Sequence, residues 1–231
     1  MAKASILNNV FYNGAVQTSS ILLNLLLMPY ITRILGKDAL GINSFGQAIV
    51  GYFVLLGNLG ITIYGAKAIA ERRDDKNSKQ QKFAECVTYQ FFFNLIAILL
   101  YNSWVIFQGD YIYFLFNIII LTSMTDLSWA YTGMERFDLI AVRNLVIKIV
   151  GTLLIFLFVK QQEDLSLFII IQQGVLLISN VVFWFELDKL EIVPRFSSLT
   201  LSLKNIFKPA IFVFIPSIFT SLYLSLNKVM L

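Results

Sequence analysis

Long runs of hydrophobic residues, each interrupted by only a few polar positions, follow one another along the whole chain. A helix needs about 20 residues, at a rise of 1.5 Å each, to cross about 30 Å of hydrocarbon. The runs that come close to or reach this length lie at 10–31, 42–63, 87–107, 111–131, 145–159 with an extension back to 140, 165–185 and 210–231. The pattern predicts an all-α fold, a polytopic transmembrane bundle of about seven spans.

The composition supports this class. Hydrophobic residues make up 58% of the chain and charged residues 14%, with a mean hydropathy of +0.74, whereas a soluble domain is typically about 45–50% apolar. The first run carries Asn13, Gln17 and Asn24 and lacks a small-residue cleavage site. It therefore predicts a retained helix and not a cleaved secretory signal.

Several kinds of catalytic chemistry lack the residues that they usually require. The chain has no histidine, which disfavours zinc sites and imidazole bases. Its one cysteine, Cys86, excludes an internal disulfide and a CxxC site, and we expect it to pack as a small apolar residue. No GxxxxGK[ST] loop for ATP occurs. We therefore predict a protein that is not an enzyme and that needs no cofactor or metal.

Lysine and arginine residues gather in alternate loops. With the N-terminus in the cytoplasm, fourteen of the 18 basic residues lie on the cytoplasmic side, where loops carry an excess of positive charge. Arg33, Lys37 and Lys160 then lie outside, and Lys228 lies in the last run. We therefore predict a cytoplasmic N-terminus. The polar run at 71–82 fits a solvated loop, and the charge pattern predicts no nucleic-acid partner.

Polar residues recur at helical spacing inside three of the runs. They are Asn9, Asn13, Gln17, Ser20 and Asn24 in the first, Ser44, Gln47, Gly51, Asn58 and Thr62 in the second, and Gln172, Gln173, Ser179 and Asn180 in the sixth. Spacings of three, four and seven place each of the first two sets on one helix face, and the third pairs Gln172 with Ser179 and Gln173 with Asn180 one heptad apart. A buried amide without a partner costs about 1–3 kcal/mol, so these faces must meet each other or water.

Two interpretations of these faces remain open. Single polar residues often form hydrogen bonds between helices, but stripes of this length favour a hydrated cavity. We predict that Asn9, Asn13, Gln17, Asn24 and Gln47 line it. Six glycines are expected to allow close helix packing: Gly14, Gly46, Gly51, Gly57, Gly60 and Gly65.

Ionisable residues inside the runs are costly to insert and often functional. Asp126 shares a helix face with Trp129 and Gly133. As alternatives, Asp126 is a proton or cation site, with Trp129 beside it in coupling or gating, or it is a structural partner of Arg143 or Lys148. Lys228 lies in the last run, in line with Ser217 and Ser221, and it can also reach the interface from a helix end.

Four groups of residues occur in the order and spacing of one known family. They are Asn9, Asn13, the run 29–36 (PYITRILG), Gly41, Phe45 and Gln47; Tyr52, Phe53, 60–61 and 64–70; Asp126, Trp129, Gly133, Glu135, Phe137, Arg143, Asn144 and Lys148; and Pro216, Tyr223, Lys228, Met230 and Leu231. With these, the whole chain resembles the Wzx-type polysaccharide flippases of the multidrug/oligosaccharidyl-lipid/polysaccharide exporter superfamily. Ser217 and Asn227 depart from the family's usual Gln and Asp, so an ion pair within that helix is not expected.

The resemblance implies a transporter of twelve to fourteen helices in two bundles around a central cavity. Its cargo is an undecaprenyl-diphosphate-linked oligosaccharide, such as an O-antigen, capsule or exopolysaccharide repeat unit. This cargo moves from the cytoplasmic to the outer leaflet of the bacterial inner membrane. We expect Arg143, Lys148 and Lys228 to give the cavity a positive potential. Outward movement of an anion gains about 2.3 kcal/mol per charge per 100 mV of inside-negative potential, so an ATPase is not required.

The resemblance also implies the domain organisation and the partners. Residues 1–209 are expected to form an N-terminal six-helix bundle and 210–231 the start of a second bundle, since the chain ends inside its seventh run. We therefore expect half of a transporter. Its expected partners are the polyprenyl-diphosphate oligosaccharide, the lipid bilayer, the C-terminal half of the same transporter and a polysaccharide polymerase.

Other functions remain as alternatives. A drug/cation antiporter of the same superfamily would favour an acidic cavity, and a lipid II flippase would share the cationic one. A polyprenyl-sugar glycosyltransferase or polymerase would need carboxylates on a sizeable external loop. The predicted external loops are short and carry only Asp38, Asp110, Glu163 and Asp164. A purely structural scaffold does not explain the ionisable residues inside the spans.

Overall fold

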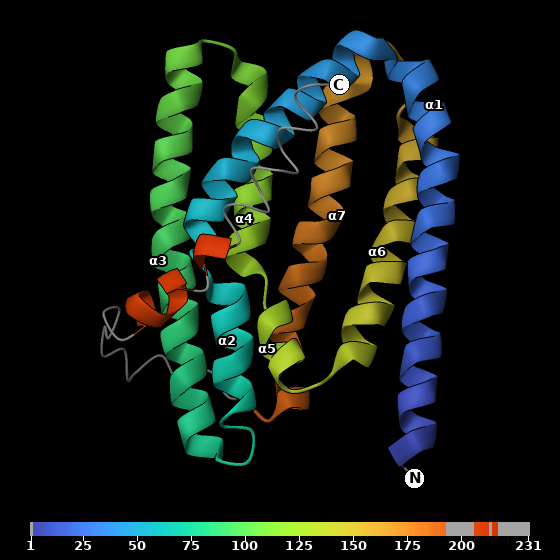
Figure 1. Cartoon of the computed structure of the whole chain (residues 1–231). Helices are drawn as coiled ribbons and strands as arrows, with labels where there is room; N and C mark the ends of the chain where they lie inside the picture. The colour runs from blue at the N-terminus through green and yellow to red at the C-terminus, as the bar shows by residue number, and fades with distance from the viewer. Residues whose placement is uncertain (1, 193–205, 213, 217–231) are drawn as a thin grey trace.

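The computed structural model describes residues 2–192, 206–212 and 214–216, with side chains from residue 22 onward. Within these residues the chain is helical, without strands, and forms an upright bundle (Figure 1). Five segments are long and apolar enough to cross a membrane. The predicted all-α polytopic bundle is therefore confirmed, and the protein is a multi-pass membrane protein. The predicted span at 210–231 lies largely outside the described residues.

The first helix, α1 (Ala2–Asn58), contains the first predicted span and most of the second. It is bent at Gly36, where φ is 74° and ψ is 175°, a conformation that essentially only glycine adopts. Figure 1 shows α1 rising along one side of the bundle, turning sharply at one end and descending across it. The 49-residue apolar segment Leu22–Ala70 therefore belongs to two membrane passes, one on each side of the bend.

The second pass is interrupted before it ends. Leu59 and Gly60 both have positive φ, 35° and 78°, and α2 (Ile61–Ala70) then continues toward the other end of the bundle. A Cβ at Gly60 would lie 2.3 Å from the carbonyl oxygen of Ala210. The predicted span at 42–63 is therefore not one continuous helix, and the backbone of a distant segment packs directly against its break.

The third pass is α3 (Lys76–Gln108), which is also longer than predicted. The Asp75 side chain caps it by accepting from the backbone N–H groups of Asn77 and Ser78. Only 71–75 is therefore a loop, and the predicted solvated loop at 71–82 is wrong over its second half. Lys79 is buried in the first turns of α3, where its Nζ donates to the Arg73 carbonyl at 3.4 Å.

The fourth predicted span, 111–131, consists of three helical pieces. A 3-10 turn, η1 (Tyr111–Phe116), leads into α4 (Asn117–Thr125), and after a break α5 (Ser128–Gly133) completes the pass. The break falls at Asp126 and Leu127. A membrane helix that stops at this depth must find other partners for its last carbonyl groups.

The last two described passes are α6 (Phe137–Phe158) and α7 (Leu165–Phe185), joined by the short helix η2 (Gln162–Asp164) and followed by η3 (Leu187–Leu190). The bends after the first, third and fifth passes lie at one end of the bundle, and the other turns lie at the opposite end (Figure 1). Turns near Lys37, Asp110 and Glu163 on one side agree with the predicted order of loops.

An ion pair joins two turns at the end where the chain begins. Arg73 Nη2 lies 3.0 Å from Glu135 Oε1 and also donates to the Gly133 carbonyl. The hydrogen bond from Arg73 holds the pKa of Glu135 below its ordinary value. Glu135 has a φ of 57°, so the turn between α5 and α6 is tight and held to the loop before α3.

Glycines let several helices approach closely, as predicted. A Cβ at Gly46 would meet the Phe116 ring at 2.4 Å, one at Gly57 the Asn94 amide at 2.7 Å, and one at Gly65 the Trp129 ring. At Gly51, in contrast, a Cβ would have no neighbour within 4 Å, so the packing role is wrong there. The side chain of Cys86 is fully buried in a hydrophobic cluster, which confirms its role as a packing residue.

Candidate functional site

The break between α4 and α5 is closed from one side by Gln90 of α3. Its amide nitrogen donates to the carbonyl oxygens of Ser123 at 2.7 Å and Asp126 at 2.9 Å. Its amide oxygen accepts from Trp129 Nε1 at 2.8 Å. Gln90 is 2% exposed. A single buried amide thus supplies partners to both sides of the interrupted helix.

Two side chains of α7 close the break from the other side. Asn180 Nδ2 donates to the Thr122 carbonyl at 2.8 Å, and Trp184 Nε1 donates to the Thr125 carbonyl at 2.9 Å. These carbonyls belong to the last turn of α4, where a helix leaves its C=O groups without intrahelical partners. Side chains of α3 and α7 therefore replace the missing backbone hydrogen bonds.

The predicted residues Asp126 and Arg143 meet at this break. The Asp126 carboxylate accepts from the Ser128 backbone N–H at 2.9 Å and from the Ser128 hydroxyl. Arg143 donates to Ser128 Oγ at 3.0 Å and to Asn180 Oδ1 at 2.9 Å, with its nearest nitrogen 3.8 Å from Asp126 Oδ1. Its guanidinium also stacks 4.3 Å above the Phe183 ring. Asp126 is thus paired with Arg143, through Ser128, and both groups are largely occupied.

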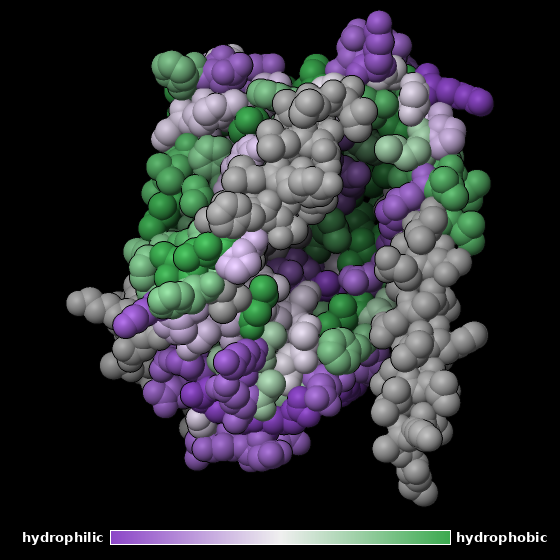
Figure 2. Space-filling view, viewed as in Figure 1, coloured by the Kyte–Doolittle hydropathy of each residue, from purple (hydrophilic) through white to green (hydrophobic). Residues whose placement is uncertain are grey.

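A polar pocket of about 340 Å³ lies farther along the same helices, between α1, α6 and α7. Its polar lining consists of Asn144, Lys148, Thr152, Gln172 and Gln173. Figure 2 shows a hollow on this side of the molecule, with hydrophilic residues at mid-height inside it. The predicted hydrated cavity has a counterpart here, although the residues that line it differ in part from those predicted.

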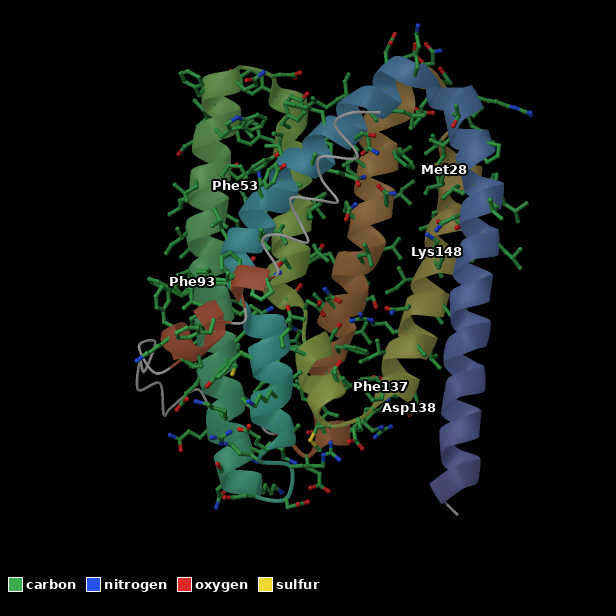
Figure 3. All side chains as sticks on the ribbon, in the orientation of Figure 1. Met28, Phe53, Phe93, Phe137, Asp138 and Lys148 are labelled. Carbon is green, nitrogen blue, oxygen red and sulfur yellow. The ribbon has the colours of Figure 1, made fainter. Side chains whose placement is uncertain are left out.

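Lys148 is the cation of this pocket. It lies at the middle of α6, about 16 Å from either end of the helix at 1.5 Å per residue, and Figure 3 shows it at mid-height. Within the described residues its ammonium group forms no hydrogen bond and no ion pair, and no carboxylate lines the pocket. Thr152 adds a buried hydroxyl without a partner. The pocket therefore contains an ammonium group without a partner among the described residues, and its wall includes a buried hydroxyl without a partner.

Gln47 extends the polar surface beside the pocket. Its amide nitrogen donates to Gln172 Oε1 at 3.1 Å and to Asn43 Oδ1 at 3.3 Å. Asn24, in contrast, is exposed in a separate surface groove with Met28, so the structure does not bring it to this pocket. The side chains of Asn9, Asn13 and Gln17, and all of Lys228, lie outside the described residues.

Sequence reasoning missed the residues that hold the break together. Gln90 and Asn94 are four positions apart on α3 and both buried. Asn94 donates to the Gly57 carbonyl at 3.1 Å. The spacing rule that identified polar faces in other runs could have identified this pair. Thr152 carried no comparable signal, because a threonine hydroxyl in a helix usually bonds the preceding turn.

The comparison with known families covers nearly the whole chain. A family described as "Polysaccharide biosynthesis protein" matches residues 6–231. The chain belongs to this family. The resemblance drawn from the sequence is confirmed at the level of the polysaccharide biosynthesis protein family.

Two curated proteins that are similar to this chain have the same name, "Putative O-antigen transporter". The one from Escherichia coli (strain K12) is 25% identical over 185 residues, which is 78% of this chain and 45% of that protein. The one from Shigella dysenteriae is 22% identical over 178 residues, 75% of this chain and 45% of that protein. The chain thus spans about half the length of these relatives. No solved structure matches it significantly.

Proposed function

We propose that this chain is part of a transporter that flips a polyprenyl-diphosphate-linked oligosaccharide from the cytoplasmic to the outer leaflet of the bacterial inner membrane. The observation that carries the proposal is Lys148, which lies in a polar pocket at the centre of α6 and has no partner among the described residues. A charge at the centre of a membrane helix costs about 2.5–3.5 kcal/mol on insertion scales. A cation without a counter-ion at this depth is explained by an anion that arrives during transport.

The pocket suits a diphosphate joined to sugars. The ammonium group supplies three donors to phosphate oxygens, while Asn144, Gln172 and Gln173 supply amides to sugar hydroxyls. The absence of a carboxylate among the lining residues favours an anionic cargo over the cationic drugs of an antiporter. The relatives named as O-antigen transporters support the same class of cargo. We propose a transport role without catalysis.

The other predicted residues have defined places in this proposal. Arg143 adds positive potential below the pocket, and Lys228, outside the described residues, stays a predicted contributor. A coupling or gating role for Asp126 and Trp129 also stays a prediction. Asp126→Asn distinguishes the alternatives, because a coupling role predicts normal folding with impaired transport and a structural role predicts impaired folding.

A second bundle completes the transporter in this proposal. Relatives about twice as long as the aligned segment support a C-terminal half that provides the opposite wall of the cavity, as in transporters built from two related bundles. A polysaccharide polymerase remains a predicted partner. Activity from a monomer of the 231-residue chain alone would contradict the two-bundle proposal, and activity only on co-expression with a C-terminal half would support it.

The proposed orientation has a cytoplasmic N-terminus. Asn77 is exposed in the first turn of α3 at the basic end of the bundle, and the native Cys86 is buried. An Asn77→Cys variant should react with an impermeant maleimide in inside-out vesicles and remain unlabelled in intact cells. Asp110→Cys, at the opposite end, should show the reverse pattern. Labelling of Asn77→Cys in intact cells would overturn the orientation.

Binding of diphosphate tests the function itself. In the purified chain, Lys148→Gln should lower the affinity for inorganic diphosphate and for undecaprenyl diphosphate at least tenfold, and Lys148→Arg should retain most of it. Lys67→Gln, on an exposed side chain, is the matched control for loss of one positive charge. Wild-type affinity in the Lys148→Gln variant would refute the proposal.

A further inference from the structure

A second, apolar groove runs between α6 and α7. It has a volume of about 480 Å³ and is lined mostly by aliphatic side chains, among them Val142, Val146 and Val150 of α6 and Ile178 and Val182 of α7, together with Arg143. Val146 is 52% exposed and Ile178 67% exposed. These side chains therefore do not pack into the bundle, and the groove is accessible to a ligand.

The groove adjoins the polar pocket. Ile147 and Val175 line both cavities, and Lys148 follows Ile147 directly in the sequence. Since α6 and α7 pack side by side, these two residues lie where the two cavities adjoin. A molecule with an anionic group and an apolar chain can occupy both cavities without placing a charged group on apolar side chains.

We propose that this groove binds the hydrocarbon chain of the polyprenyl diphosphate while the diphosphate lies at Lys148. The inference rests on the proposed function and adds a site for the lipid part of the cargo. The chain would leave the polar pocket past Ile147 and Val175 and run along the valines of α6. The groove thereby fixes the position of the lipid chain along α6, so that its diphosphate stays beside Lys148.

Size and charge favour this occupant over a membrane phospholipid. A volume of about 480 Å³ is in the range of sites for one drug-sized ligand and offers room for the part of one chain that is nearest the diphosphate. The lining from Leu139 to Val150 spans about 16 Å of helix. Glu186 and Lys189, at the far end of the groove, are paired at 2.6 Å, so the unpaired cation lies at the other end, with Lys148.

Photo-crosslinking tests the assignment. The probe is undecaprenyl diphosphate with a diazirine in the isoprene units nearest the diphosphate, bound to the purified chain in bilayer nanodiscs. Adducts should concentrate on 142–150 and 175–182, and Val146→Trp, which fills the groove, should reduce them at least fivefold. Leu153→Trp is the matched control, since Leu153 is 56% exposed on the same face of α6, seven residues farther on and outside the groove.

Further experiments distinguish an error in the choice of occupant from an error in the groove assignment or in the proposed function. A phosphatidylglycerol carrying the same diazirine should label exposed residues of α3 and α6 without preference, and equal concentration in the groove would overturn the choice of occupant. Unchanged crosslinking in Val146→Trp, with thermal stability preserved, would overturn the groove itself. If Lys148→Gln still weakens inorganic diphosphate binding in that case, the proposed function stands without the groove.

Discussion

Two groups of polar side chains lie inside the same apolar bundle and differ in how far they are satisfied. At the break between α4 and α5, Gln90, Asn180, Trp129 and Trp184 all use their side-chain nitrogens as hydrogen-bond donors. In the pocket, Lys148 has no partner among the described residues. A buried polar group costs free energy unless it is paired, so the first group stabilises the fold and the second is available to a ligand.

Threonines show the same difference on a smaller scale. Thr88, Thr122 and Thr132 each donate to the carbonyl oxygen four residues earlier, as threonines in helices commonly do. Thr152 is buried and does not. Three other described polar atoms share this property, Arg73 Nε, Asn94 Oδ1 and Asn117 Oδ1, but only Thr152 lines the pocket. Among these described threonines, Thr152 therefore differs from the others in lacking a partner inside its own helix.

The largest loss of stability is expected at the break. Gln90→Leu leaves the Trp129 N–H and the Asp126 carbonyl unpaired, and each buried orphan costs about 1–3 kcal/mol. The Ser123 carbonyl keeps only the Asp126 backbone N–H as a donor. We expect a loss of about 3 kcal/mol in the free energy of unfolding, measured by denaturant titration in mixed micelles. Gln81→Leu, on the exposed surface of the same helix, should change it by less than about 0.5 kcal/mol. Equal effects would show that the break is not held by Gln90.

Packing around the break gives the next largest effect. A Cβ at Gly65 would lie 2.7 Å from the Trp129 ring, and overpacking of this kind costs about 1–3 kcal/mol. Gly65→Ala should therefore lower stability by about 2 kcal/mol. Gly51→Ala meets no atom within 4 Å and gains helix propensity of up to about 1 kcal/mol. Thermal unfolding of the two variants should shift in opposite directions, and a shift of both in the same direction would contradict this.

Lys148 should behave in the opposite way to Gln90. Lys148→Met removes an unpaired charge from the centre of α6, so we expect the purified chain to become more stable by about 1 kcal/mol, a part of the insertion cost of such a charge. Diphosphate binding should fall in the same variant. Higher stability with lower affinity would separate a binding residue from a structural one. A loss of stability would mean that the ammonium group has a structural partner.

The membrane passes could be predicted from hydropathy because each must cover the hydrocarbon with apolar residues. The breaks within these passes could not be predicted from hydropathy. In the sequence, Asp126 and Leu127 look like part of a continuous span. The helix can stop there because Gln90 and Asn180, from other passes, donate hydrogen bonds to its backbone carbonyl groups. When side chains of other helices replace backbone hydrogen bonds in this way, the local sequence carries no pattern that predicts it.

The candidate site could be predicted in part. Lys148 and Gln47 were identified from charge and spacing, and the structure places both at the pocket or beside it. Asn24 shares the spacing but is exposed elsewhere, because the bend at Gly36 and the packing of α1 on α6 decide which side of the helix faces inward. Spacing assigns residues to one face, and only the packing of helices decides what that face meets.

The smallest effect, and the sharpest test of the comparison, concerns one hydroxyl. Thr152→Val replaces the unpartnered buried hydroxyl with a methyl group of similar shape, so stability should change by less than about 0.5 kcal/mol. If the hydroxyl contacts cargo, the affinity for diphosphate or for a sugar diphosphate should fall about fivefold, the equivalent of about 1 kcal/mol for one hydrogen bond. Thr88→Val is the control, because its hydroxyl is already bonded within α3 and lies outside the pocket; its affinity should match the wild type. A Thr152→Val variant that is clearly less stable, yet binds normally, would place Thr152 with the structural group.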